Sequence, residues 1–204
     1  MDKLKIEKNI DVLGSEIARV HTLIAAISEI VKQCNLNAEV YKKYSKFFDD
    51  VYYAFYNELI HTVSKLHDKS RDSLSIVRML QANKDKKSIR EEAILQQICE
   101  HDAYKKIKII RDKLGRAHLD AKISINPGKQ RELYEAHKIA LKNIAEYIEL
   151  MTEALETISE RLDIPILLSK PSVPIKREIT EIFNELNSRL DLSKMPETIN
   201  NYSL

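Results

Sequence analysis

The stretch KLKIEKNIDVLGSEIARVHTLIAAISEIVKQ, residues 3–33, decides the fold class. Its apolar residues recur at helical spacing: Leu4, Ile6, Ile10, Leu13, Ile17, Val20, Ile24, Ile27 and Val31. At this spacing the apolar residues form one stripe along a helix, and the charged residues lie on the other side. The stretch therefore predicts a long amphipathic helix that ends near Asn35 and Asn37.

Similar patterns predict helices along most of the remaining chain. The segments are an aromatic-rich helix at 38–67, a short helix after a Ser73 cap, long helices at 86–122 and 129–162, and a last amphipathic helix at 175–190. The turn sequence Asn126-Pro127-Gly128 separates the two later long helices. We therefore predict an all-α protein, an antiparallel bundle of four long helices with short accessory helices.

Prolines divide the predicted bundle from a C-terminal part. Residues 1–163 hold the four long helices, and residues 164–174 contain Pro165, Pro171 and Pro174. Proline lacks a backbone donor and disfavours helix at the residue before it, so 164–174 predicts a connector. Residues 175–204 then form a C-terminal helix and tail.

Composition limits the class of protein. Charged residues make up 31% and hydrophobic residues 44%, with only 3 glycines, a balance that favours helices over sheets. The net charge of +2 is too small for nucleic-acid binding by bulk electrostatics, so any basic surface is local. No apolar run approaches membrane length, and we expect a cytoplasmic protein with no membrane partner. Cys34 and Cys99 lack metal-type spacing and predict buried free thiols.

The segment KIIRDKLGRAHLD, residues 108–120, combines residues suited to phosphate chemistry. Arg111 and His118 are seven positions apart, about two helical turns, so both point the same way. Gly115 lies between them on that face and costs about 1 kcal/mol against alanine in a helix. A guanidinium and a titratable imidazole beside open space form a candidate phosphate site. The alternative from spacing alone is a surface arginine and a half-buried histidine.

A helical wheel places this pair at the border between core and solvent. The core side holds Ala103, Ile107, Ile110, Leu114, Ala117 and Ala121, while Tyr104, Lys108, Gly115 and Lys122 join Arg111 and His118 at the border. A border position suits a cleft that a polymer can reach. The similar pair Arg131 and His137 is six positions apart, about 120° around the helix, and is not interpreted as a site.

The string Arg111-Asp112-Lys113-x-x-x-Ala117-His118-x-Asp120 resembles the HEPN superfamily, specifically its AbiU-type branch of abortive-infection proteins. A second stretch is similar to the same branch: Val63-Ser64-Lys65-Leu66-His67-Asp68, then Asp72-Ser73-Leu74-Ser75-Ile76-Val77-Arg78-Met79-Leu80. The resemblance covers about residues 1 to 160. It implies a helical domain that dimerises and brings two arginine–histidine motifs to one cleft.

Many members of this superfamily are metal-independent endoribonucleases acting as toxins or antiphage effectors. The resemblance implies that His118 is the acid/base and that Arg111 stabilises the phosphorane. It also implies that Asp112 takes the polar position beside Arg111. The alternative for Asp112 is an ion pair with Arg116. Lys108 and Lys122 are candidate RNA phosphate contacts, or ordinary solvated lysines. No cofactor or metal is expected, and the partners are RNA, a second copy, and an antitoxin or regulatory protein.

Two features depart from the family pattern. The gap of six residues between Arg111 and His118 is at the long end of its range, and Asp120 stands where some members carry a tyrosine. Regulation by nucleotidylation of such a tyrosine is therefore not expected. The main alternative function is a non-catalytic helical adaptor that binds RNA or a partner on the same scaffold.

Other patterns indicate structure rather than chemistry. Glu58 and His61 have the spacing of di-iron bundles, but only one such pair occurs. His67 lies at a predicted helix end and is interpreted as structural. The aromatic residues of 38–67 are interpreted as core or dimer contacts rather than a base-stacking surface. There is no glycine-rich phosphate loop, which argues against an NTPase.

Overall fold

The computed structural model describes residues 3–70, 72–82, 88–114, 132, 136–137, 139–166 and 173–192. Its helices are α1 (Lys3–Leu36), α2 (Ala38–Leu66), α3 (Ile76–Ala82), α4 (Ile89–Glu100), α5 (Asp102–Leu114), α8 (Leu141–Leu162) and α9 (Val173–Leu192). These ranges contain no strand. The all-α prediction is confirmed for this part of the chain.

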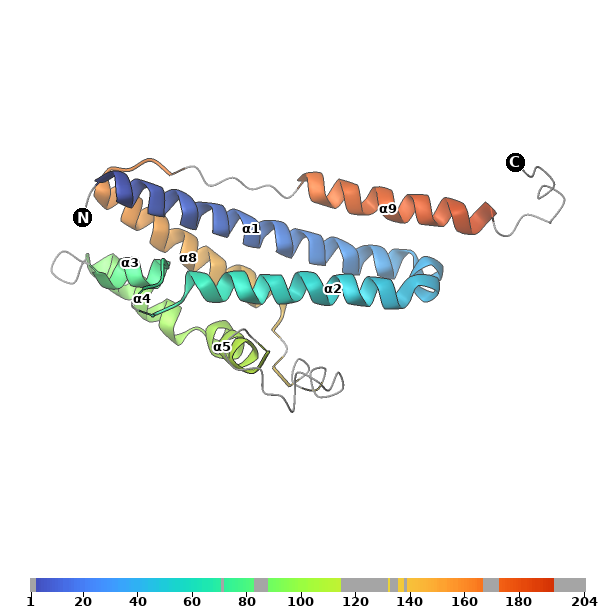
Figure 1. The fold of residues 1–204 in the computed structure, drawn as a ribbon, viewed down its shortest axis with the longest axis horizontal. Coiled ribbons are helices and arrows are strands. Elements are labelled where there is room, and N and C mark those ends of the chain that lie inside the picture. The colour runs from blue at the N-terminus through green and yellow to red at the C-terminus, as the bar shows by residue number, and fades with distance from the viewer. Residues whose placement is uncertain are drawn as a thin grey trace.

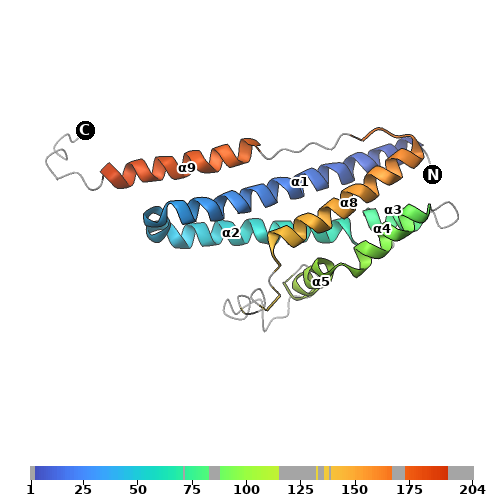
Figure 2. The same ribbon diagram turned by 180° about the vertical axis from the view of Figure 1, so that it is seen from behind.

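Three long helices build the main core. α1 and α2 run antiparallel, and α8 packs beside α1 (Figure 1; Figure 2). The stripe predicted for α1 is confirmed along most of its length, because Ile10, Ile17 and Ile27 are at most 1% exposed. Leu4 and Val31 at its ends are exposed, and Ile6 and Ile24 are half-buried. The core therefore lies where the helical period places it.

The chain reverses direction between α1 and α2 over a few residues. Asn37 leaves the helical conformation, and its Nδ2 donates to the Gln33 carbonyl at 3.0 Å. A second departure at Tyr44 (φ −119°, ψ 24°) bends α2. Beyond this bend Phe48 and Tyr56 are buried, which agrees with a core role for the α2 aromatics, whereas Phe47 is exposed.

The predicted continuous helix over 86–122 is wrong, because α4 and α5 are separate. α4 begins with a capping box in which Ser88 and Glu91 bond each other's backbone. His101 then adopts an extended conformation (ψ 132°), and its Nδ1 accepts from the Ala103 backbone N–H at 3.2 Å. A side-chain acceptor at the break satisfies a donor of the new helix, so α5 starts in a new direction.

Three further boundaries differ from the predictions. The helix predicted over 129–162 is interrupted, since Ala140 is extended (ψ 138°) immediately before α8. α9 begins at Val173 and includes Pro174, which the first turn of a helix tolerates. Ser75 rather than Ser73 caps α3, because the Ser75 hydroxyl accepts from the Arg78 backbone N–H at 3.1 Å.

α9 lies along the C-terminal half of α1 and away from α5 (Figure 1; Figure 2). Phe183 of α9 is 1% exposed and stacks on Phe48 of α2 with ring centroids 4.5 Å apart. A polar contact runs beside it, in which the Thr180 hydroxyl donates to the Glu29 carboxylate at 3.3 Å. The hydrogen bond from Gln33 lowers the pKa of Glu29 against the opposing effect of burial. These contacts fix α9 against α1 and α2.

We expect Phe183→Ala to detach α9 while the main bundle stays folded. The substitution removes a buried ring from a small cluster, which costs up to about 3–5 kcal/mol. Hydrogen exchange followed by mass spectrometry measures this as lost amide protection in α9 peptides with unchanged protection in α8. Ile182→Ala is the matched control, because the neighbouring Ile182 is 52% exposed. Equal loss of protection in both variants would contradict this packing.

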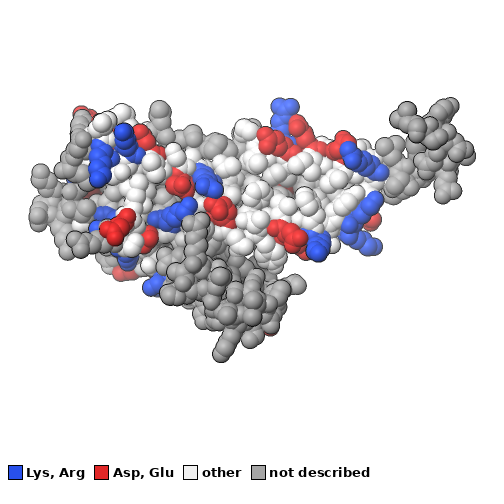
Figure 3. Space-filling view, viewed as in Figure 1, with Lys and Arg blue, Asp and Glu red and all other residues white. Residues whose placement is uncertain are grey.

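Charges of both signs are interspersed on the face seen in Figure 3. Several acidic and basic side chains pair one turn apart on the same helix, such as Arg177 with Glu181 at 2.8 Å. Exposed pairs of this kind contribute little stability. In the ranges given above, every helix is too short or too polar to cross a membrane.

Candidate functional site

α5 is the helix on which the sequence places the arginine of the candidate site. Its residues Ala103, Ile107 and Ile110 are at most 2% exposed and pack into the main core. Asp102 and Lys108 are exposed. The predicted core side of this helix is therefore confirmed over residues 103–110, whereas Lys108, predicted at the border, is exposed.

The structure places only some of the predicted site residues. Lys108 is exposed on α5, and Arg111 and Asp112 belong to the last turn of that helix, where only the backbone is described. His118 and Lys122 lie outside the described residues. The proximity of Arg111 to His118 thus stays a prediction, as does the role of Asp112.

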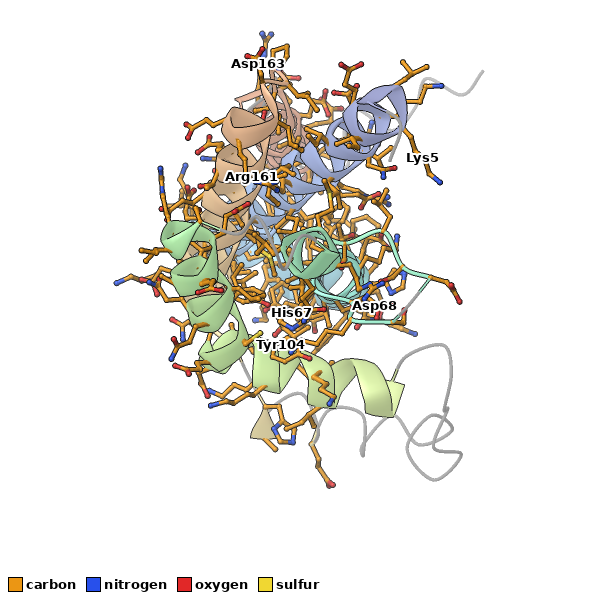
Figure 4. The ribbon with its side chains drawn as sticks, turned by 90° about the vertical axis from the view of Figure 1, so that its left-hand side faces the viewer. Lys5, His67, Asp68, Tyr104, Arg161 and Asp163 are labelled. Atoms are coloured by element: carbon orange, nitrogen blue, oxygen red, sulfur yellow. The ribbon has the colours of Figure 1, made fainter. Side chains whose placement is uncertain are left out.

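A cluster that the sequence did not indicate joins α5 to the bundle. His67, at the C-terminal end of α2, is 2% exposed and its Nδ1 is hydrogen-bonded to the Tyr147 hydroxyl of α8. Its ring stacks on Tyr104 of α5, with centroids 3.4 Å apart and planes inclined by 23°. Figure 4 shows His67 and Tyr104 together between the end of α2 and α5. We call these three residues the His67 cluster.

The His67 cluster is polar, and His67 and Tyr147 are deeply buried in it while Tyr104 is half-buried. Tyr147 is 0% exposed, and burial raises its pKa far above the ordinary value of a phenol. The phenol therefore stays neutral and keeps its hydrogen-bonding capacity. The His101 ring, at the break between α4 and α5, lies 5.0 Å from the Tyr147 ring. Residues of α2, α5 and α8 thus meet at one point, which holds the start of α5 in place.

Only the structural role of His67 in this cluster was predicted from the sequence. The structural interpretation of His67 agrees with its burial and its bond to Tyr147. Its partners carry no local signal, because Tyr147 lies 80 residues away in the chain. Helical period predicts that a residue lies at the border between core and solvent, but it does not predict which side chain from a distant part of the sequence contacts it.

Lys69 lies at the exposed edge of this cluster. Its Nζ donates to the Cys99 sulfur at 3.4 Å and lies 5.5 Å from the centre of the Tyr104 ring. Cys99 and Cys34 are free and half-buried, so the prediction of free thiols is confirmed but that of full burial is not. Burial raises the pKa of the Cys34 thiol, and the nearby Asp49 adds to this.

Other groups in the described part of the chain serve structure. Glu58 pairs with Arg19 at 2.8 Å, and no set of three metal-ligating side chains is found there. Glu91, 1% exposed, is held by Arg161 at 2.9 Å and by the capping box. These contacts explain the charges of Glu58, Glu91 and Arg161 without a ligand.

An open cavity of about 430 Å³ lies at the C-terminal end of α8. Its lining is Glu156, Ser159, Glu160, Asp163, Ile164, Pro165 and Ile166. Figure 4 shows Asp163 at the top of that view, well away from Tyr104 in its lower half. Three carboxylates repel a phosphate, so this cavity does not fit the chemistry predicted for Arg111 and His118.

Comparison of the chain with protein-family models, with curated proteins and with solved structures gives no match. The resemblance to the HEPN superfamily therefore rests on the motifs of residues 63–80 and 111–120.

Proposed function

We propose that this protein is a metal-independent endoribonuclease of the HEPN type, acting as a toxin or antiphage effector. The observation that carries the proposal is the segment around α5, which has Arg111 and His118 seven positions apart with Gly115 between them. The core-facing residues of α5 support it, because they fit the helical phase from which the border position of Arg111 was deduced. Lys108, one turn before Arg111, is exposed as a phosphate contact needs to be.

The proposed reaction is an internal transfer within the RNA strand. The 2′-oxygen attacks the adjacent phosphorus as its proton is removed, and the bond from phosphorus to the 5′-oxygen breaks as that oxygen gains a proton. The products are a 2′,3′-cyclic phosphate and a 5′-hydroxyl. His118 acts as the general acid/base for these proton transfers, since imidazole titrates near neutral pH.

Arg111 has a different role in the proposed reaction. Negative charge develops on the phosphate oxygens as the phosphorane forms, and a guanidinium offers planar, bidentate donors to them. Asp112 is proposed to take the polar position beside Arg111 in the site. The resemblance further implies a homodimer with two such motifs in one cleft, controlled by an antitoxin or regulatory protein.

The test of this function is incubation of the purified full chain with end-labelled structured and unstructured RNAs in EDTA. We expect cleavage that leaves cyclic phosphate ends. RNA binding without cleavage would support the alternative of a helical adaptor. Cleavage that appears only after a divalent metal is added would contradict a metal-independent mechanism.

A further inference from the structure

The segment that follows α2 is held firmly next to α5. The Asp68 carbonyl accepts from the Ser75 hydroxyl, and also from the Ser73 hydroxyl at 3.1 Å. The Asp68 carboxylate accepts from the Ser70 backbone N–H at 2.9 Å. Since His67 is buried beneath α5, residues 67–70 have a defined position against that helix.

This position brings Lys69 to the side of α5. The Lys69 side chain contacts Cys99 of α4 and the Tyr104 ring of α5, at 3.4 Å and 5.5 Å respectively. Among the ion pairs of the described residues, Lys69 and Lys108 have no carboxylate partner, unlike Lys106, which binds Asp102 at 3.0 Å. Lys69 and Lys108 are both exposed, so an anion can reach them from solvent.

Lys69 and Lys108 lie along one edge of the helix that leads to Arg111. Tyr104, which Lys69 contacts, precedes Lys108 by four positions and Arg111 by seven. Positions four and seven apart share a helix face, and the span from Tyr104 to Arg111 is about 10 Å along the axis. Two positive charges thus line the approach to the position of Arg111.

We propose that Lys69 binds a phosphate of single-stranded RNA and, with Lys108, guides the strand along α5 to Arg111. This inference rests on the proposed function. The strand is single because attack by the 2′-oxygen in line with the leaving oxygen requires departure from A-form geometry. Each lysine contributes a backbone contact, so the binding is independent of sequence and sensitive to salt.

The test uses the full chain carrying His118→Ala, so that binding is measured without cleavage. Fluorescence anisotropy with a fluorescein-labelled, unstructured 12-nucleotide RNA gives Kd over a series of salt concentrations. We expect Lys69→Ala to raise Kd several-fold and to reduce the salt slope by about 0.7, the value for one phosphate of a single strand. Lys69→Arg keeps the charge and should retain most of the affinity.

Lys46→Ala is the matched control, because Lys46 is an exposed lysine near the other end of α2. Equal Kd values for Lys69→Ala and Lys46→Ala, or no RNA binding by any variant, would overturn the inference. Binding that depends on Lys69 in a chain whose wild type does not cleave would refute the nuclease but keep this contact. If the wild type cleaves RNA but the RNA affinity does not depend on Lys69, the Lys69 contact is refuted and the proposed nuclease function is kept.

Discussion

His118→Ala should lower the rate of RNA cleavage by about 10²–10⁴-fold, the range typical for loss of a general acid/base. Binding of the same RNA should change little, because the imidazole acts on protons in the transition state rather than on the bound strand. Single-turnover cleavage in EDTA measures the first quantity and anisotropy the second. The pH profile of the wild type should show a group titrating near neutrality, which His118→Ala removes.

Arg111→Ala belongs to the same experiment and should lower cleavage by about 10²–10³-fold. Arg111→Lys should restore little, because an ammonium does not reproduce the bidentate geometry of a guanidinium. The matched controls are Arg131→Ala and His137→Ala, a second arginine–histidine pair whose spacing predicts divergent directions. Equal losses of cleavage rate in both arginine–histidine pairs, or no loss in either pair, would contradict the assignment of Arg111 and His118 as the catalytic residues.

Tyr147→Ala should destabilise the whole bundle, with a loss of about 3–5 kcal/mol in the free energy of unfolding. Tyr147 is fully buried and bonded to His67, and both residues lie where α2, α5 and α8 meet. Tyr147→Phe keeps the ring but leaves the His67 nitrogen without the hydroxyl, which costs about 1–3 kcal/mol. Urea unfolding followed by circular dichroism measures the free energy of unfolding of both variants.

Tyr41→Phe is the control for the hydroxyl effect. The Tyr41 hydroxyl donates to Asp49 at 3.0 Å, but this bond is exposed, so its loss should change stability by less than about 0.5 kcal/mol. If Tyr147→Phe is as stable as Tyr41→Phe, the hydrogen bond in the His67 cluster does not hold these helices together.

The parts of the fold that the sequence predicts are those set by local period. The buried stripe of α1 and the core side of α5, with Ile107 and Ile110, follow from helical spacing alone. The break at His101 does not, because the apolar pattern continues across it through Ile98 and Ala103. Its cause is a histidine side chain that caps the next helix, a role that residue preferences for capping do not indicate.

In the candidate site, too, the sequence predicts features set by helical spacing but not those set by packing between helices. Helical phase places Lys108 at the border between core and solvent, where the structure shows it exposed. The pairing of Arg111 with His118 is still a prediction from spacing. The contact of Lys69 with Tyr104 depends on how α2 and α5 pack, and no pattern within either helix encodes it. The stacking of Phe183 on Phe48 is likewise set by tertiary packing.

Attack by the 2′-oxygen is tested with an RNA that carries one 2′-deoxynucleotide on the 5′ side of a mapped cleavage site. In EDTA, we expect cleavage at that bond to disappear while other sites in the same strand are still cut, since the attacking 2′-oxygen is missing at one place only. Unchanged cleavage at the substituted bond would show that water or another nucleophile attacks the phosphate, and would contradict the proposed mechanism.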